Sequence, residues 1–555
     1  MRKLFSYCLP VVNLNLFRVL PSDAIKRTLL MMTLLSIVLL AACGGGGHTE
    51  GNTNPAMPMP TTDVSGTVLY KGVPMSGVTI IAIDGNSNST YGTATTDVNG
   101  NYSFSGIPVW INDKNLSHNI QFIANKPGYG FYPFMASNLS GSRAGYIFDT
   151  MPHNWYVNVG AAVTRAGFNG QFTNINGAGI MLTILNYMAT IDNSMTGANF
   201  NAYDGTNPLV RIAASGQTTS YVSGDDGSLN KGVAWPETRF VDNQNGTVTD
   251  NLTGLIWLKN AGCISTAAWA NALTEVNQLA SGSCGLTDGS TTGQWRMPNV
   301  VEFESIVDVS SSNPALPVGN PFTNVSNSIY WTSTSYYGGQ AGSPNAWTIR
   351  LGDGRYINDS ILNLKASASN AVWAVKGTGG GTIKLQATGA YVQDVSGDDS
   401  SVENGIPLPS PRFIDNSNGT VTDLVTGLIW LKQADCINQT WAGAISAVNS
   451  LASGHCGLTD GSTTGSWRMP NRKEMLSLAD RAQNNMAEYF DESFISKNTA
   501  LNSQPAVFTN FVGFNYYWTS TTNSANTSEA WTVFSCDYGV YDIPKSNTGY
   551  TLAVR

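Results

Sequence analysis

The stretch "DNQNGTVTDNLTGLIWLKNAGC" runs from Asp242 to Cys263, and "DNSNGTVTDLVTGLIWLKQADC" repeats it 173 residues downstream, from Asp415. In both copies Asn-Gly supplies residues that tolerate positive φ, which is typical of a hairpin turn between two strands. A second turn at Thr-Gly precedes a third strand, "LIWLK", whose tryptophan, Trp257 or Trp430, is expected to fill a core. The stretch therefore predicts a three-stranded meander that is built twice.

The duplication extends well beyond this stretch. "CGLTDGSTTG", "WRMPN" and "YWTST" each occur twice in the same order. A period this long indicates duplicated domains, because stacked solenoid units repeat every ~20 to 50 residues. The spacing lengthens to 187 at "YWTST", so the second copy carries an insertion between Asp480 and Tyr516.

Two helices are expected in each copy. Apolar residues recur at about 3.6-residue spacing from Trp269 to Leu279, which predicts an amphipathic helix. Asn299 then stands three residues before Glu302, the pattern of a capping box that opens a second helix. The second copy repeats both signals, so each copy is expected to be an α+β domain.

The cysteines favour structural bridges. Cys263 and Cys284 flank the first helix, and Cys436 and Cys456 flank its counterpart, so each pair is expected to form a disulfide in an oxidising compartment. A metal centre would need more ligands, and no repeated histidine stands nearby. Cys536 is left over, and a packed thiol and an intermolecular bridge remain open for it.

The N-terminus reads as an export signal. Lys26 and Arg27 precede an apolar run from Thr28 to Ala42, too short for the ~20 residues of a membrane span. Its end, Leu-Ala-Ala-Cys43, resembles a bacterial lipoprotein signal, which implies lipidation of Cys43 and, with Gly44 next, delivery to the outer membrane. An ordinary signal peptide is the alternative, and the long leader suggests a later start codon.

The segment after the signal is expected to be a spacer. Residues 44–61 are rich in Gly, Pro and Thr and predict a flexible linker. Residues 62–205 begin with strand and turn patterns, among them "TTDVNGNYSFSGIP". This part resembles the prealbumin-like (carboxypeptidase-regulatory) modules of secreted bacterial proteins, which implies an all-β sandwich.

The motifs "RFVDNQNGTVTDNLTGLIWLK", "WRMPNVVEFESIVD", "YWTSTS" and "NAWTIRL" resemble the family of the Lcl C-terminal domain, named for a Legionella collagen-like adhesin. The resemblance covers about residues 214–376 and 387–555. It implies a C-type-lectin-like fold and a surface adhesin that binds sulfated glycosaminoglycans. Family members often end with a cysteine where this chain has Ala374 and Ala553, so their C-terminal bridge is expected to be missing.

The charge of the chain argues against a polyanionic ligand. The net charge is −8, which disfavours nucleic acid and sulfated polymers as partners. A neutral sugar held by aromatic and amide groups is at least as consistent with this composition. The candidate ligand contacts lie in the first copy, at Tyr336, Tyr337, Arg350 and Arg355, with ordinary packing or surface tyrosines as the alternative.

Catalysis is not expected. No zinc-protease, serine-hydrolase or phosphate-loop motif occurs, so no catalytic residue and no cofactor are assigned. The carboxylates that recur, Asp250 with Asp288 and Asp423 with Asp460, are explained by turns and caps. Calcium remains a minority alternative, because "SGDDGS" and "DNQNGTVTD" are rich in oxygen ligands but lack full EF-hand spacing.

These observations predict a multidomain protein, with an N-terminal all-β sandwich followed by two α+β C-type-lectin-like domains. The expected boundaries are 1–43 for the signal, 44–61 for the linker, 62–205 for the sandwich, and 206–378 and 379–555 for the repeats. The expected function is non-catalytic adhesion or glycan recognition at the bacterial surface by a membrane-anchored lipoprotein. A structural or assembly module without a small ligand is the alternative.

Overall fold

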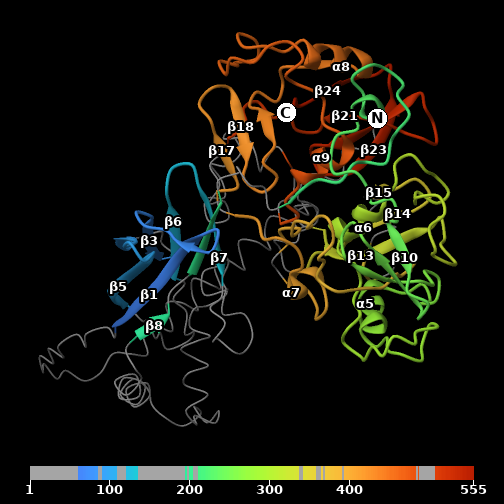
Figure 1. Cartoon of the computed structure of the whole chain (residues 1–555), viewed down its shortest axis with the longest axis horizontal. Coiled ribbons are helices and arrows are strands. Elements are labelled where there is room, and N and C mark those ends of the chain that lie inside the picture. The colour runs from blue at the N-terminus through green and yellow to red at the C-terminus, as the bar shows by residue number, and fades with distance from the viewer. Residues whose placement is uncertain are drawn as a thin grey trace, which may run out of the picture. The chain divides into compact units, whose positions relative to one another are not determined.

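The structure is a computed structural model of the chain (Figure 1). It describes residues 61–84, 90–108, 120–134, 194–196, 199–203, 210–336, 342–357, 364–366, 369–390, 393–409, 411–482, 486 and 507–555. The signal, Cys43 and the linker therefore lie outside the described residues. Within those ranges no helix has the length and apolar character needed to cross a membrane.

The described residues between 61 and 203 form mainly β-strands. They are β1 (Thr61–Tyr70), β2 (Val73–Pro74), β3 (Thr79–Asp84), β4 (Thr90–Thr95), β5 (Asn101–Pro108), β6 (Ile120–Asn125), β7 (Gly130–Phe134), β8 (Ser194–Thr196) and β9 (Asn199–Tyr203). One sheet has the order β2-β1-β9-β7, with β5 and β8 also paired to β1, and a second has the order β4-β3-β6. A single apolar cluster takes residues from both sheets, including Val68, Ile80, Tyr102 and Phe122.

The first repeat contains strands around a few short helices. Its elements are β10 (Phe240–Asp242), β11 (Thr247–Asp250), β12 (Ile256–Leu258), α5 (Trp269–Asn277), α6 (Val300–Ile306), β13 (Ile329–Ser335), β14 (Ala346–Arg350), β15 (Arg355–Ile357) and β16 (Val375–Lys376). They form a sheet of order β10-β11-β12-β16 and a second sheet of order β13-β14-β15.

The second repeat has the same plan with a longer second sheet. Its elements are β17 (Phe413–Asp415), β18 (Thr420–Asp423), β19 (Ile429–Leu431), β20 (Asn438–Thr440), α8 (Trp441–Asn449), α9 (Arg472–Ser477), β21 (Tyr516–Thr522), β22 (Glu529–Phe534), β23 (Val540–Pro544) and β24 (Thr548–Tyr550). The sheets have the orders β17-β18-β19 and β20-β24-β21-β22-β23. The chain is thus a multidomain, mostly β protein with two repeated sheet-rich units. Most of the predicted insertion from Asp480 to Tyr516 lies outside the described residues.

The meander predicted from the opening stretch is confirmed in both repeats. In the first, β11 pairs antiparallel with β10 and with β12, and the third strand buries Trp257 completely. Gly246 in the turn has a φ of +84°, and an added Cβ would come within 2.4 Å of the carbonyl oxygen of Gly285. Glycine is therefore required twice over, by the turn and by the close approach of the loop that follows Cys284.

Both predicted helices are confirmed. Trp269, Leu273 and Val276 form the buried face of α5. At the start of α6 the Asn299 side chain accepts from the N–H of Glu302, and the Glu302 carboxylate accepts from the N–H of Asn299, which completes the capping box. The second repeat forms the same box with Asn471 and Glu474.

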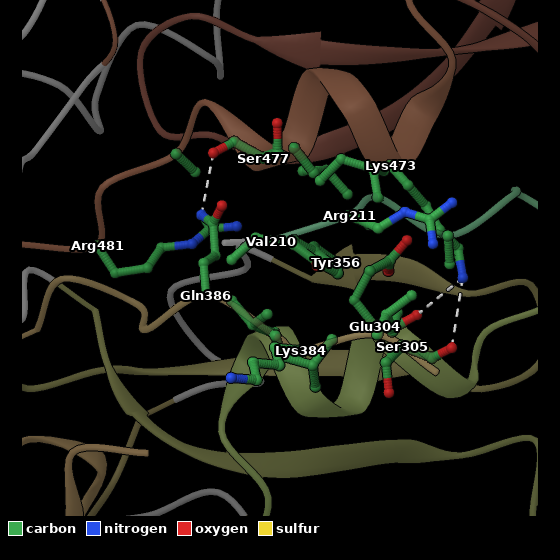
Figure 2. A pocket seen from close by; sticks show the side chains of 17 residues that line it. Val210, Arg211, Glu304, Ser305, Tyr356, Lys384, Gln386, Lys473, Ser477 and Arg481 are labelled. Atoms are coloured by element: carbon green, nitrogen blue, oxygen red, sulfur yellow. Dashed lines mark hydrogen bonds between the residues drawn. The ribbon is translucent and has the colours of Figure 1, made fainter. Parts of the chain in front are cut away.

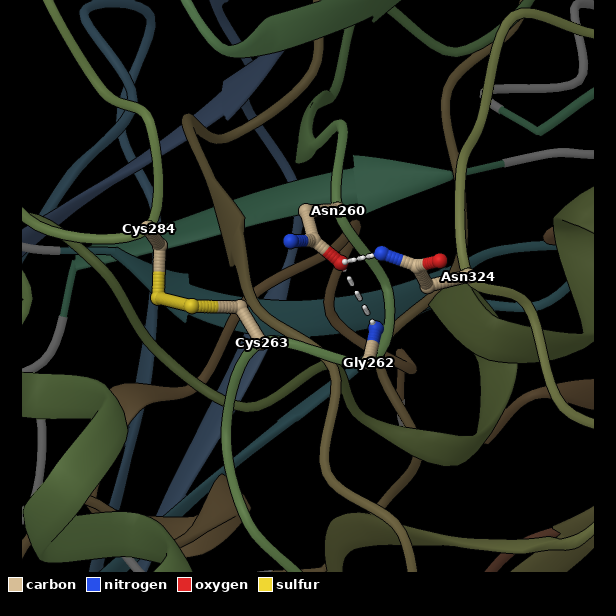
Figure 3. Close-up of a disulfide and its surroundings, with 5 residues drawn as sticks. All are labelled: Asn260, Gly262, Cys263, Cys284 and Asn324. Atoms are coloured by element: carbon tan, nitrogen blue, oxygen red, sulfur yellow. Dashed lines mark hydrogen bonds between the residues drawn. A yellow bond between two sulfur atoms is a disulfide. The ribbon is translucent and has the colours of Figure 1, made fainter.

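Both expected disulfides are present. Cys263 is bonded to Cys284 (Figure 3), and Cys436 is bonded to Cys456, across loops of 21 and 20 residues. Closing loops of this length stabilises a fold by about 3 kcal/mol. Near the first bridge, Asn260 accepts hydrogen bonds from the N–H of Gly262 and the side chain of Asn324. Cys536 is buried just after β22 and is disulfide-bonded, so the packed free thiol, one of the two alternatives for its role, is wrong.

The segment that precedes each repeat packs on the other repeat. We call residues 210–235 the first arm and residues 383–408 the second arm. The first arm contains α4 (Asp226–Leu229), which contacts β21, and the second contains α7 (Asp399–Val402), which contacts β13. In Figure 1 the orange α7 accordingly lies beside the yellow-green elements of the first repeat. The two repeats therefore exchange their arms reciprocally.

Candidate functional site

The first candidates are the carboxylates that recur in both repeats. Asp250 is fully buried and forms an ion pair with Arg239, at 3.2 Å, and its oxygens also bind the N–H of Leu252 and the hydroxyl of Thr253. Arg239 in turn donates to the carbonyl oxygen of Ser305 at the end of α6. The pair thus ties the opening meander to the second helix of the repeat.

The second repeat repeats this arrangement. Arg412 and Asp423 are both fully buried, their ion pair measures 2.7 Å, and Arg412 donates to the carbonyl oxygen of Ser477. A carboxylate whose oxygens accept from a buried guanidinium and from donors of its own turn has its hydrogen-bonding capacity used inside the protein. Asp250 and Asp423 therefore serve the scaffold of their repeats.

The other recurring carboxylates have partners of their own. Asp288 pairs with Lys376, and Asp460 pairs with Arg555 at 2.8 Å. Burial alone would raise the pKa of each carboxyl. Hydrogen bonds from Lys376 and Ser290 lower the pKa of Asp288, and hydrogen bonds from Ser462 together with the positive charge of Arg555 lower that of Asp460. Asp250 and Asp288 thus bind different cations, and the structure gives each a structural role.

The loops considered for calcium use their oxygens internally. In "DNQNGTVTD", Asp242 pairs with Lys259 at 2.6 Å, and the Asn243 and Asn245 side chains bind threonine hydroxyls of the same hairpin. In "SGDDGS", the Asp225 side chain caps α4 through the N–H of Ser228. In the described part of the chain, no group of three or more His, Cys, Asp or Glu side chains could hold a metal ion.

Of the two tyrosines proposed as ligand contacts, Tyr336 is within the described residues, and it does not lie on an open surface. Tyr336 is buried and packs against Trp347, with their ring centroids 5.0 Å apart. Tyr337 lies outside the described residues. A role in ligand contact for this pair remains a prediction, and Tyr336 has the packing expected of the alternative interpretation.

The arginines proposed as ligand contacts are both in ion pairs. Arg350 pairs with Asp353 within the turn between β14 and β15. Arg355 pairs with Asp542 of the second repeat and lies 3.6 Å from Asp353. Arg355 therefore joins the two repeats, and its availability to a ligand is correspondingly small.

A cavity lies where the two repeats meet (Figure 2). It is lined by the starts of both arms, by α6, and by α9 with the turn that follows it, and its volume is about 70 Å³. Pockets that bind small organic ligands begin at roughly 300 Å³. The Gln386 side chain donates to the carbonyl oxygen of Ser477 across this space. The cavity is too small for a sugar ring and is a feature of the joint between the repeats.

The charged groups around the cavity pair across the joint. Glu304 of α6 accepts from Arg472 of α9 at 2.8 Å, and both side chains are buried. Lys473 points to the carbonyl oxygens of Glu304 and Ser305, at 3.5 and 3.4 Å. Burial, with the positive charge of Arg239 nearby, lowers the pKa of Lys473 to about 8. Arg481 stacks on Trp347 of the first repeat, 4.2 Å from the ring centroid.

Sequence reasoning missed the two carboxyls that fasten the arms. Asp226 accepts from Thr521 of the second repeat at 2.6 Å, and Asp399 accepts from Thr334 of the first at 2.8 Å. Burial raises the pKa of both carboxyls to about 6. A signal for these two carboxyls is present in the recurring "SGDD". The first aspartate of this motif caps the short helix, so the second aspartate needs a different partner.

Comparison with known proteins identifies the repeats. The family of the Lcl C-terminal domain matches residues 246–376 and 419–555, one match in each repeat. No curated protein matches the chain. The protein therefore carries two Lcl C-terminal domain units, each with its disulfide bond.

Proposed function

From the two Lcl C-terminal domain units, we propose that the protein is a non-catalytic binding lipoprotein of the bacterial surface. Its Cys43 carries the lipid anchor in the outer membrane, and its N-terminal strands form a prealbumin-like sandwich that acts as a spacer. The paired repeats, with a C-type-lectin-like fold, take part in adhesion or glycan recognition. The family match and the leader sequence support this proposal.

One observation carries the non-catalytic part of the proposal. The four recurring carboxylates considered for acid–base chemistry, Asp250, Asp288, Asp423 and Asp460, are each engaged by a cation of their own repeat. General acid–base catalysis needs a carboxyl that can exchange a proton with a bound substrate. The shared chemistry of the repeats is thus used by the scaffold, which leaves specificity to surfaces where the repeats differ.

The alternative, a structural module of the envelope, has its own supporting observation. The exchanged arms and the buried Glu304–Arg472 pair join the repeats into one unit. A firmly joined pair of domains is well suited to an assembly role without any small ligand. The two candidate functions differ in whether a saturable ligand exists.

A glycan-array screen of residues 62–555 separates the two functions. Saturable binding of a defined glycan, with or without calcium, supports recognition, and its absence from a broad array supports the structural alternative. The anchor is tested separately in cells. Replacement of Cys43 by Ser should release the protein from the membrane fraction and abolish labelling by a fatty acid, while an unchanged membrane fraction contradicts lipidation.

A further inference from the structure

Each repeat holds one lysine at the same place. The carbonyl oxygen of Lys365 accepts from the N–H of Trp269 at the start of α5, and that of Lys545 accepts from the N–H of Trp441 at the start of α8, at 3.2 and 3.1 Å. The Lys365 ammonium lies 4.2 Å from the ring centroid of Trp269, and the Lys545 ammonium lies 4.0 Å from that of Trp441. The two lysines therefore occupy equivalent positions.

In the first repeat the ammonium of this lysine is paired with a carboxylate of the protein. Asp394 of the second arm pairs with the ammonium of Lys365 and also accepts from the hydroxyl of Ser335 and the N–H of Gly342. The Lys365 ammonium donates to the same Ser335 hydroxyl, at 2.7 Å. The Lys365 and Asp394 side chains are only 13% and 8% exposed.

In the second repeat a tyrosine takes the place of that carboxylate. The N–H of Tyr221 binds the capping carboxylate of Asp225 at 2.6 Å, as the N–H of Asp394 binds that of Asp398 at 2.7 Å. Tyr221 therefore stands where Asp394 stands in the other repeat. Its side chain is 43% exposed, and its ring centroid lies 4.7 Å from the Lys545 ammonium.

Lys545 consequently lacks the counter-ion that Lys365 has. Its ammonium donates to the hydroxyl of Thr522 at 2.8 Å, and over the described ranges no carboxylate lies within ion-pair distance of it. Asp225 contributes a weaker attraction, but its oxygens are bound by the N–H groups of Tyr221 and Ser228. Lys545 is thus a half-buried cation beside a hydroxyl and an exposed aromatic face, and no described carboxylate pairs with it, so an external anion would be stabilised at this place.

We propose that Lys545, Thr522 and Tyr221 form a binding site for the carboxylate of an external ligand that carries this group on a ring, as an acidic sugar does. The ligand carboxylate takes the place that Asp394 fills in the first repeat, accepting from the Lys545 ammonium and the Thr522 hydroxyl. The ring of the ligand lies over the exposed face of Tyr221. The first repeat has no such site, because its own carboxylate occupies the position. The proposal rests on the glycan recognition proposed above and names a ligand class for it, and the variants of Lys545 and Tyr221 test the site separately from that function.

The test compares methyl β-glucuronide with methyl β-glucoside, which differ in the carboxylate, by ligand-observed saturation-transfer NMR on the purified protein. The glucuronide should bind and the glucoside should bind at least about tenfold more weakly, since ion pairing and hydrogen bonds to charged groups are lost. Equal binding of both sugars, or no binding of the glucuronide, overturns the proposal.

The chain supplies its own matched variant, Tyr221→Asp, which copies the first repeat into the second. The new carboxylate should pair with Lys545 and abolish glucuronide binding while the melting temperature stays the same or rises. Lys545→Met should also abolish binding, whereas Tyr221→Phe, which keeps the ring, should retain it. Undiminished binding by folded Tyr221→Asp or Lys545→Met protein would show that the sugar binds elsewhere and overturn the site.

Discussion

The second helices of the two repeats begin with the same cap and then present different side chains to each other. Where α6 has Val300 and Glu304, α9 has Arg472 and Leu476 at the equivalent places. Glu304 of one helix meets Arg472 of the other. Two copies of the first repeat would bury Glu304 without a cation, and two copies of the second would bury Arg472 without a carboxylate. The difference teaches that these repeats are matched to each other, although their scaffolds are alike.

The largest expected change in the free energy of unfolding tests whether the two repeats have equivalent scaffolds. Asp423→Asn should lower the free energy of unfolding by about 3 to 5 kcal/mol, because it leaves the buried Arg412 without its counter-ion. Asp250→Asn should have a similar effect in the first repeat, measured by urea denaturation. A change below about 1 kcal/mol in either repeat would contradict the role assigned to these pairs.

The next effect tests the difference between the repeats. Arg472→Val, which copies Val300 into α9, should destabilise the protein by about 3 kcal/mol, because Glu304 is left buried and unpaired. Glu304→Leu, which copies Leu476 into α6, should have a similar effect through Arg472. The double variant should recover stability relative to the sum of the single variants. Additive losses in this double-mutant cycle would show that the two side chains are not coupled.

A comparable effect is expected from the disulfides. Replacing Cys263 and Cys284 together by Ser should lower stability by about 3 kcal/mol, and so should replacing Cys436 and Cys456, because the closed loops differ by one residue. Thermal unfolding of the two variants checks this. A loss in one repeat that is several times larger than in the other would break the equivalence of the two scaffolds.

The smallest effect concerns the exchanged arms and depends on pH. The pKa values of Asp226 and Asp399 are raised to about 6 in the folded protein, so the folded state binds more protons than the unfolded state between pH 3.8 and 6. Their contribution to stability is therefore present at low pH and is lost as the pH rises through 6. Each carboxyl should make the protein more stable at pH 5 than at pH 7 by about 1 kcal/mol.

The matched control for this effect is the double variant Asp226→Asn and Asp399→Asn. The amides resemble the protonated carboxyls in shape and can still accept from Thr521 and Thr334. The variant should lose the stability difference between pH 5 and pH 7. An unchanged difference would assign the pH dependence to other groups.

The sequence predicted the parts of the fold that depend on near neighbours. The meander, the buried Trp257 and Trp430, the capping boxes and the disulfides all follow from turn residues, periodicity and cysteine spacing within about 30 residues. These signals are local, so they can be read without knowing what packs against them. The presence of the same signals in both repeats gave each prediction an internal check.

The exchange of the arms could not be predicted in the same way. The expected boundaries, 206–378 and 379–555, place each arm with the repeat that follows it, and nothing within an arm says which repeat will cover it. "SGDDGS" was considered for calcium because its oxygens are visible in the sequence. The hydroxyls of Thr521 and Thr334, which cover the second aspartate, come from distant strands.

The surroundings of the candidate ligand contacts also depend on parts of the chain that are distant in sequence. Tyr336 and Arg355 were chosen where the repeats differ in sequence, and the structure shows that one is packed on Trp347 and the other joins the repeats. A difference between repeats marks a contact surface as readily as a ligand site. The replacement of Asp394 by Tyr221 matters for binding because Lys365 and Lys545 occupy equivalent places, and this equivalence depends on the fold.

The exchange of arms also constrains the order in which parts of the protein can fold. Asp226 and its partner Thr521 are separated by 295 residues, so α4 cannot take its place until β21 has been synthesised. The first repeat likewise waits for α7 before β13 is covered. Neither repeat can be finished before the other, and contacts this distant in sequence form slowly. Each repeat therefore keeps part of its surface uncovered until nearly all of the chain has been synthesised.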